Sequence, residues 1–199
     1  MELIFIALLI IFVIIIIAIA LSSSKDEYFL HPERSAGKRG EEYVQNLIKS
    51  VLNENDTLLT NVSLEYENRK TELDNVIVNK YGVFIIEVKY YVGKLHGSEE
   101  DYEWLKVKTT DADEIYEKVV KNPIPQVKRQ IDITARYLRD YGINVWVEGY
   151  AYFVNNNSAV DSEYVLYDKE DIDHTVHTFK RNRLSKKKVE EIVRLLNNN

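Results

Sequence analysis

A carboxylate and an ammonium group lie two residues apart near the end of a strongly apolar segment, VFIIEVKYY. Side chains alternate between two faces along a strand, so Glu87 and Lys89 share a face. Asp74 lies in the preceding strand-like segment, ELDNVIVN, and a short turn containing Gly82 joins the two segments. This arrangement predicts a hairpin in which Asp74 is opposite or diagonal to Glu87.

Two carboxylates and a lysine have the chemistry needed to cut a phosphodiester. Carboxylate oxygens are the ligands that Mg²⁺ and Mn²⁺ prefer. Such a metal neutralises phosphate charge and lowers the pKa of a bound water, while a lysine stabilises charge that develops at phosphorus. Because Glu-x-Lys is also common on exposed strands, Glu87 and Lys89 alone would favour a solvated ion pair over a catalytic site.

Four separated segments strengthen the catalytic interpretation, and they occur in the order GKRGEEYV, ELDNVIVN, VFIIEVKYYVGKLHG and NPIPQVKRQ. Together they resemble the NERD (nuclease-related domain) family of the PD-(D/E)xK nuclease superfamily. The resemblance covers roughly residues 36–155. It implies an α/β fold, with a mixed sheet flanked by helices and a restriction-endonuclease-like core.

The resemblance also implies roles for individual residues. Asp74 and Glu87 would be the central metal ligands, Glu41 a helix carboxylate at the same metal, and Lys89 the catalytic lysine. Gln126 would lie at the edge of the site, against the metal shell or the nucleic-acid backbone. The implied cofactor is Mg²⁺ or Mn²⁺, and none of these matched positions is substituted.

Each of these residues also has a structural explanation. Glu41 suits a helix N-terminus because of the helix dipole, Asp74 suits a sheet edge or turn, and Gln126 suits a first helical turn. Glu87 and Lys89 suit an ion pair with each other. Glu72 and Gln130 are candidates only for positions outside the immediate site.

Periodicity and turn residues predict the elements that position these groups. The expected helices span residues 36–52 with Ser35 as N-cap, residues 123–141 before Gly142, and residues 185–197 after the N-cap Ser185. The expected strands span residues 57–64, 72–79, 83–91, 94–96, 104–108, 144–154 and 164–167. This order predicts a mixed sheet with helices packed on it.

The N-terminus contains an uninterrupted apolar run, residues 3–21, which would span roughly 28 Å as a helix, about the thickness of a bilayer core. We therefore expect an N-terminal transmembrane anchor (residues 1–22), a linker (23–34) and one domain (35–199). A buried core helix and a signal peptide cleaved near Ala20, which would release a secreted enzyme, are the alternatives. Basic residues follow the run and Glu2 precedes it, which favours an uncleaved anchor with the domain in the cytoplasm.

The remaining charged and histidine residues are less specific. The net charge of −6 argues against a general polyanion-binding surface but leaves a local basic groove open. A basic cluster within residues 180–188 could contact nucleic-acid phosphates or anionic lipids, or form a solvated face. His174 and His177 are three residues apart, but the chain has no Cys to support a metal site with them.

The sequence thus predicts a membrane-anchored, metal-dependent nuclease that acts on nucleic acid, with DNA preferred over RNA as the substrate. The alternative is a module that binds nucleic acid or a protein at the membrane without cutting.

Overall fold

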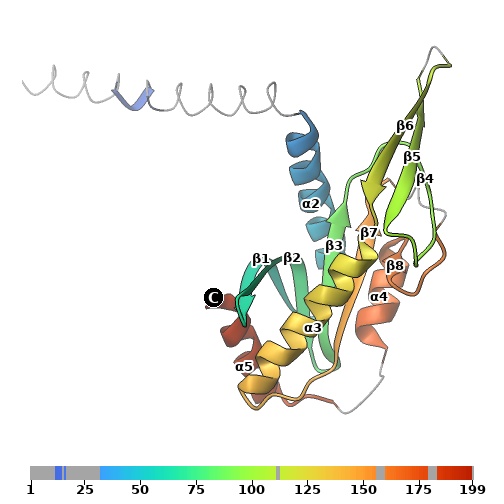
Figure 1. Cartoon of the computed structure of the whole chain (residues 1–199). Helices are drawn as coiled ribbons and strands as arrows, with labels where there is room; N and C mark the ends of the chain where they lie inside the picture. The colour runs from blue at the N-terminus through green and yellow to red at the C-terminus, as the bar shows by residue number, and fades with distance from the viewer. Residues whose placement is uncertain are drawn as a thin grey trace, which may run out of the picture. The chain divides into compact units, whose positions relative to one another are not determined.

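The computed structural model (Figure 1) describes residues 12–14, 16, 32–110, 113–155, 160–178 and 183–198. The chain divides into two compact units, Met1–Arg39 and Gly40–Asn199. The second unit holds both sheets and the predicted site residues.

Most of the predicted anchor, residues 3–21, lies outside the described residues. Of that run, residues 12–14 and 16 are described, and they are helical. Within the described part of the chain, no helix is both long and apolar enough to cross a membrane. The anchor therefore stays a prediction.

The main sheet has five strands in the order β1-β2-β3-β7-β8. The first three pair antiparallel, whereas β3, β7 and β8 pair in parallel. This confirms the predicted mixed sheet. The strands are β1 (Thr57–Tyr66), β2 (Arg69–Asn79), β3 (Gly82–Lys89), β7 (Val147–Phe153) and β8 (Val165–Leu166).

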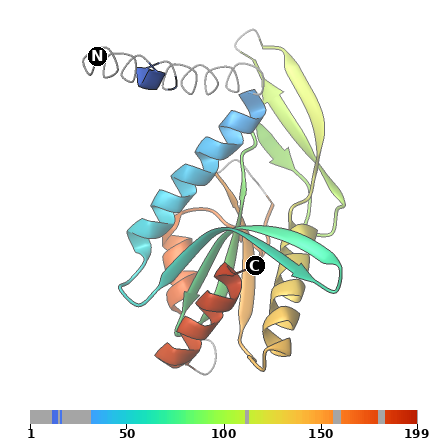
Figure 2. The same cartoon turned by 90° about the vertical axis from the view of Figure 1, so that its left-hand side faces the viewer.

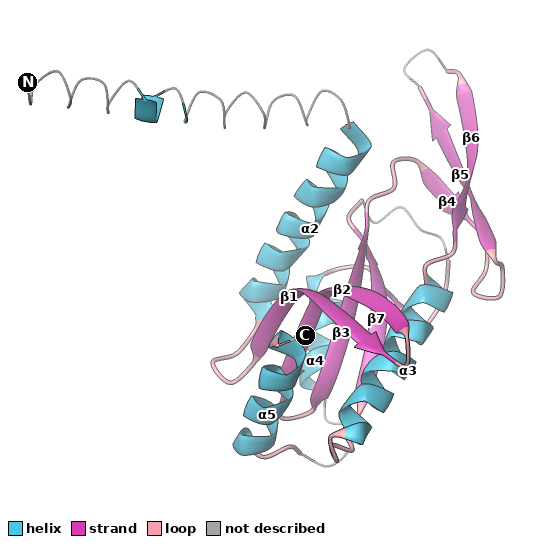
Figure 3. Ribbon diagram, turned by 60° about the vertical axis from the view of Figure 1, so that its left-hand side comes forward, coloured by secondary structure: helices cyan, strands magenta, loops and turns pink. Residues whose placement is uncertain are grey.

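Helices cover both faces of this sheet. Helices α3 (Ile124–Asp140) and α5 (Lys186–Asn197) lie on one face, and α4 (Lys169–His177) lies behind the strands in Figure 3. Figure 2 shows the same layers from another side, with the part of α2 (Pro32–Val51) that belongs to the second unit, residues 40–51, along the face that α4 covers. The predicted antiparallel hairpin and its flanking helices are therefore present.

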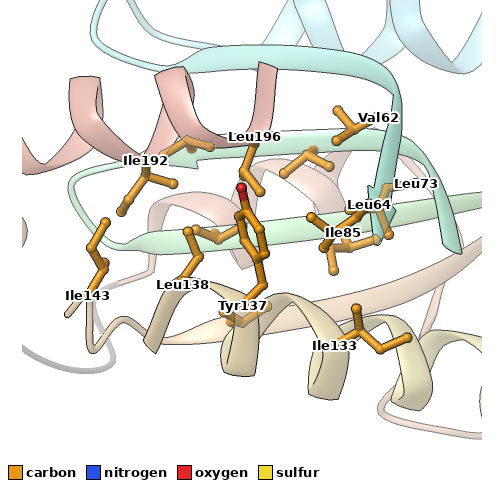
Figure 4. Close-up of a cluster of buried hydrophobic side chains, with 14 of the residues drawn as sticks. Val62, Leu64, Leu73, Ile85, Ile133, Tyr137, Leu138, Ile143, Ile192 and Leu196 are labelled. Atoms are coloured by element: carbon orange, nitrogen blue, oxygen red, sulfur yellow. The ribbon is translucent and has the colours of Figure 1, made fainter. Parts of the chain in front are cut away.

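Alternation along β3 divides the core between the two faces. Val83 and Ile85 pack with α3 and α5 in the cluster of Figure 4, whereas Phe84 and Ile86 pack with α2 and α4. All four side chains are almost fully buried. At roughly 1.5–3 kcal/mol for each buried aliphatic or aromatic side chain, this strand is a main source of stability.

A second, three-stranded antiparallel sheet is formed by β4 (Lys94–His96), β5 (Glu103–Thr109) and β6 (Ile115–Lys121). Its base is anchored by Trp104, whose ring centroid lies 5.8 Å from that of Phe153. Strand β6 was not predicted, because most of its side chains are exposed and it lacks the pattern of a core strand.

Two helices differ from the prediction. Helix α2 begins at Pro32, inside the predicted linker, because proline fits a first helical turn where its missing N–H has no partner. Helix α4 was not predicted, since its short length carries only two buried apolar residues, Ile172 and Val176. Its N-cap is Asp168, whose carboxylate accepts a hydrogen bond from the Asp171 N–H.

Candidate active site

Strand β3 presents Glu87 and Lys89 on the face that α3 covers. The Glu87 side chain is buried and Lys89 is half-buried. The Lys89 Nζ donates to Glu87 Oε1 at 2.6 Å. The ion pair considered from the sequence is therefore present, but it is buried rather than solvated.

Helix α3 supplies the other partners of Glu87. The Gln126 Nε2 donates to Glu87 Oε1 at 2.7 Å, and the Gln130 Nε2 donates to Glu87 Oε2 at 2.7 Å. The Gln126 Oε1 also accepts a hydrogen bond from Lys89 Nζ at 3.2 Å. Both oxygens of Glu87 are thus held in place by side chains of β3 and α3.

Close packing of α3 on β7 makes these contacts possible. A Cβ atom added at Gly149 would lie 2.9 Å from side-chain atoms of both Val127 and Ile131. Only glycine lets the helix approach the strand so closely. The helix is thereby near enough to the sheet for the two glutamine side chains to reach β3.

Asp74 lies on β2 where regular strand pairing stops. The β2–β3 ladder ends at the pair Asn75–Ile86, and opposite Asp74 in β1 Asn61 has a positive φ of 52°. The Asp74 Oδ2 accepts a hydrogen bond from the Val88 N–H at 2.7 Å. The Asp74 carboxylate thus takes the place of a backbone partner for the Val88 N–H just beyond the end of the ladder. This bond fixes Asp74 beside Glu87 of β3.

The environment of Asp74 disfavours its negative charge. Burial and the nearby Glu87 carboxylate raise the pKa of Asp74 to about 7 from the ordinary value of 3.8. The Val88 hydrogen bond and the Lys89 charge oppose this shift, and the charge of Glu41 adds to it. Two carboxylates that repel each other in a sheltered site favour either a shared proton or a bound cation.

The outer half of the β1–β2 ribbon forms one wall of the site. Figure 3 shows this ribbon bending toward α3. The Arg129 Nη2 donates to the Lys70 carbonyl at 3.0 Å, and the Gln130 Nε2 donates to the Glu72 carbonyl at 2.9 Å. Between the ribbon and α3 is an open pocket of about 540 Å³. It is lined by Ser63, Lys70, Thr71, Glu72, Asp74, Glu87 and Gln126.

The structure thus brings four of the five predicted site residues together, namely Asp74, Glu87, Lys89 and Gln126. The fifth, Glu41, is half-buried on α2 and acts on Asp74 through its charge. Gln130, which the sequence placed outside the immediate site, is fully buried and bonded directly to Glu87.

Ser63, Lys70 and Thr71 were missed as lining residues. Their positions depend on the bend of the β1–β2 ribbon, for which the sequence gives no local signal.

The residues fit a divalent cation held by two carboxylates. In the described ranges, no group of three or more His, Cys, Asp or Glu side chains is arranged to hold a metal. Mg²⁺, however, is commonly bound through one or two carboxylates with water and substrate phosphate completing its shell. Asp74 and Glu87 supply such carboxylates, and the buried Gln130 Oε1 beside them has no hydrogen-bond partner.

A mixed sheet with an acidic residue on one strand and Glu-x-Lys on the next is the arrangement of the PD-(D/E)xK nuclease superfamily. The family model of the nuclease-related domain matches residues 36–154. The chain belongs to this nuclease-related domain family, as its motifs predicted.

A curated relative provides limited further information. An uncharacterized protein of Bacillus anthracis is 31% identical over 75 residues, which are 37% of this chain and 35% of the relative. The match thus spans about a third of that relative's length. No solved structure matches the chain.

Proposed function

We propose that the chain is a metal-dependent nuclease that hydrolyses phosphodiester bonds, with DNA as the preferred substrate. The observation that carries this proposal is that Asp74, Glu87 and Gln126 line one open pocket, with Lys89 bonded to Glu87 and Gln126. Membership of the nuclease-related domain family supports the same chemistry. The carboxylates of Asp74 and Glu87 would hold Mg²⁺ or Mn²⁺, which supplies charge neutralisation and an activated water.

The side chains of the chain have distinct tasks in this proposal. Gln126 and Gln130 hydrogen-bond to Glu87, so its carboxylate is already oriented before a metal ion binds. Lys89 exchanges its bond to Glu87 for a phosphate oxygen and stabilises the developing negative charge there. Gln126, which is exposed and bonded to both residues, is placed to contact the nucleic-acid backbone.

The proposed location is the cytoplasmic face of a membrane. It is supported by the apolar run at residues 3–21 and by the basic residues that follow it. An anchor so close to the domain would restrict cleavage to nucleic acid near the bilayer. Deleting residues 1–24 is expected to move the protein from the membrane fraction to the soluble fraction, and unchanged fractionation would contradict the anchor.

A cleavage assay tests the proposed activity. The full chain in nonionic detergent is incubated with supercoiled plasmid or RNA, in Mg²⁺, Mn²⁺ or EDTA. We expect cleavage that requires metal and that Asp74→Ala or Glu87→Ala abolishes. The matched control is Glu170→Ala on the exposed side of α4. The proposal fails if no substrate is cut, or if the Asp74 and Glu87 variants cut as fast as the wild type.

A second candidate function is binding without cleavage. It is favoured by the saturation of Glu87, because both of its oxygens already accept hydrogen bonds from side chains of the same chain. This candidate predicts binding that needs no metal and survives Glu87→Ala. A salt titration then separates the partners, since binding to phosphates weakens steeply with salt.

A further inference from the structure

The β5–β6 ribbon carries its charges on separate faces. Residues directly opposite each other in an antiparallel pair share a face. One face contains the pairs Lys106–Lys118 and Lys108–Tyr116, and further along Trp104–Val120, where the ribbon joins the core. We call the outer part of this face, formed by Lys106, Lys108, Tyr116 and Lys118, the lysine face.

The lysine face brings three lysines together on a protein whose net charge is −6. Like charges directly opposite each other destabilise a strand pair, and Lys106 is directly opposite Lys118. Lys108 lies two residues further along, opposite Tyr116, whose side chain is 58% exposed. Toward the tip, Glu114 accepts a hydrogen bond from the Tyr116 hydroxyl.

The opposite face of the ribbon has a different character. It pairs Leu105 with Val119, and Glu103 with Lys121. It also pairs Val107 with Glu117, so this face carries two carboxylates and one lysine, and it has no pair of lysines opposite each other. Lys121 on this face, and Lys94 of β4, which is opposite Val107, provide control lysines on the same small sheet.

The ribbon is held firmly next to the candidate site. Strand β4 begins soon after Lys89, and β6 ends just before the turn into α3. In that turn, the Asn122 Nδ2 donates to the carbonyls of Glu99 at 2.9 Å and Asp101 at 2.7 Å, while Asn122 Oδ1 accepts from the Ile124 N–H. Figure 1 shows the ribbon projecting from the end of the main sheet where β3 finishes.

We propose that the lysine face binds the phosphate backbone of the nucleic acid whose phosphodiester enters the pocket. The inference rests on the proposed nuclease function and adds a second point of contact to it. Lysines suit phosphates, and an exposed tyrosine ring suits base or sugar contacts. A two-stranded ribbon also has the width that the major groove of DNA admits. With a net charge of −6, the chain needs such a local basic strip to hold a polyanion.

A binding titration tests the lysine face independently of cleavage. The full chain in nonionic detergent and EDTA is titrated against a fluorescein-labelled DNA duplex, and anisotropy is followed at several salt concentrations. The test variant is Lys106→Gln/Lys108→Gln/Lys118→Gln. The control is Lys94→Gln/Lys121→Gln/Lys169→Gln, which changes the net charge equally but leaves the lysine face intact.

We expect the test variant to bind the duplex about tenfold or more weakly, with a log–log salt slope shallower by about 2–3, since each phosphate contact contributes about 0.9 to the slope. The control should retain the wild-type slope. Equal losses in both variants, no loss in the test variant, or no duplex binding by the wild type would each overturn the inference.

The midpoint of urea unfolding shows whether each variant is folded. If the triple variant is unfolded, DNA binding by Lys108→Glu is compared with DNA binding by Lys94→Glu. Cleavage by the wild type in Mg²⁺ is measured separately. Absence of cleavage would refute the nuclease function, while the anisotropy comparison would still decide whether the lysine face binds nucleic acid.

Discussion

Two ionic clusters, on opposite faces of the main sheet, use similar side chains in different arrangements. The pocket cluster consists of Asp74, Glu87, Lys89, Gln126 and Gln130. The histidine cluster consists of Asn53, Asp56, Asp173 and His177 and joins α4 to the loop between α2 and β1. In the histidine cluster, the His177 ring nitrogens lie 2.8 Å from Asp56 Oδ2 and 2.6 Å from Asp173 Oδ1.

The two clusters differ in the position of the positively charged side chain relative to the two carboxylates. Burial alone would lower the pKa of His177, but the hydrogen bonds to Asp56 and Asp173 outweigh it and raise that pKa. The histidine thus separates two carboxylates and binds both. In the pocket cluster, Lys89 bonds to only one of the two carboxylates, that of Glu87, and the repulsion between Glu87 and Asp74 remains. The first arrangement braces the fold, whereas the second favours a further cation.

The largest difference between the clusters should be in metal binding. Glu87→Gln removes a charged ligand while keeping the shape of the side chain. We expect Mn²⁺ affinity, measured by electron paramagnetic resonance, to fall by about 100-fold or more, beyond the 10- to 100-fold typical of an outer partner. His177→Gln should leave the affinity unchanged. Equal Mn²⁺ binding by both variants would remove the distinction between the clusters.

Gln130 should have the next largest effect, because it orients Glu87 without binding substrate. In Gln130→Leu both hydrogen bonds of the Nε2 group are lost, and we expect Mn²⁺ affinity to fall by about 10- to 100-fold. Gln130→Glu, which keeps the length but not the donor, should not restore it. A wild-type affinity in Gln130→Leu would show that Gln126 and Lys89 orient Glu87 alone.

The histidine cluster should matter for stability instead. His177→Ala leaves the buried Asp56 carboxylate without its charged partner. We expect the free energy of unfolding, from urea titration, to fall by about 1–3 kcal/mol. Thr178→Ala, next to the cluster at the end of α4, is the control. A loss no larger than that of the control would refute the bracing role.

The pH dependence of stability should separate the clusters again. Because the pKa of Asp74 is about 7 in the folded state and 3.8 in its ordinary state, the folded chain holds a proton that the unfolded chain releases. The free energy of unfolding should therefore fall as pH rises from about 4 to 7. The raised pKa of His177 adds stability below its ordinary pKa of 6.5, which is lost as pH rises through the folded value.

Mg²⁺ should reduce the fall in the free energy of unfolding that Asp74 causes, because the ion binds the ionised carboxylates. It should leave the fall that His177 causes unchanged. Urea titrations of Asp74→Asn and His177→Gln across this pH range, each with and without Mg²⁺, show which residue causes which fall in stability. A decline that neither variant alters would place the titrating groups elsewhere.

The smallest effect should come from Glu41. It influences Asp74 through space, so we expect Glu41→Gln to lower Mn²⁺ affinity roughly tenfold or less. The control is Glu42→Gln, the exposed neighbour on the same helix. A loss as large as that of Glu87→Gln would instead support the role as a metal ligand that the motif implied.

The strands of the main sheet could be predicted because their local signals agree with their burial. In β3, alternation, β-branched residues and a glycine turn all indicate the same hairpin, and this also placed Glu87 and Lys89 correctly on one face. Ser185 likewise caps α5 as expected, accepting a hydrogen bond from the Lys188 N–H.

Other features depend on contacts between distant segments. The wall of the pocket requires Arg129 and Gln130 of α3 to meet the carbonyls of β2. The lysine face requires β6 to pair with β5, yet β6 has few apolar residues facing a core. The role of Gln130 could not be predicted from its position in the sequence, because it follows from the close approach of α3 at Gly149.

The central claim is that the pocket cluster is a metal-dependent nuclease centre, and a plasmid time course tests it most directly. The wild type, Glu87→Gln and His177→Gln, each as the full chain in nonionic detergent, are followed in Mg²⁺ and after addition of EDTA. We predict cleavage by the wild type and His177→Gln that stops with EDTA, and none by Glu87→Gln. Cleavage by Glu87→Gln at the wild-type rate, or no cleavage by any of the three, would contradict the claim.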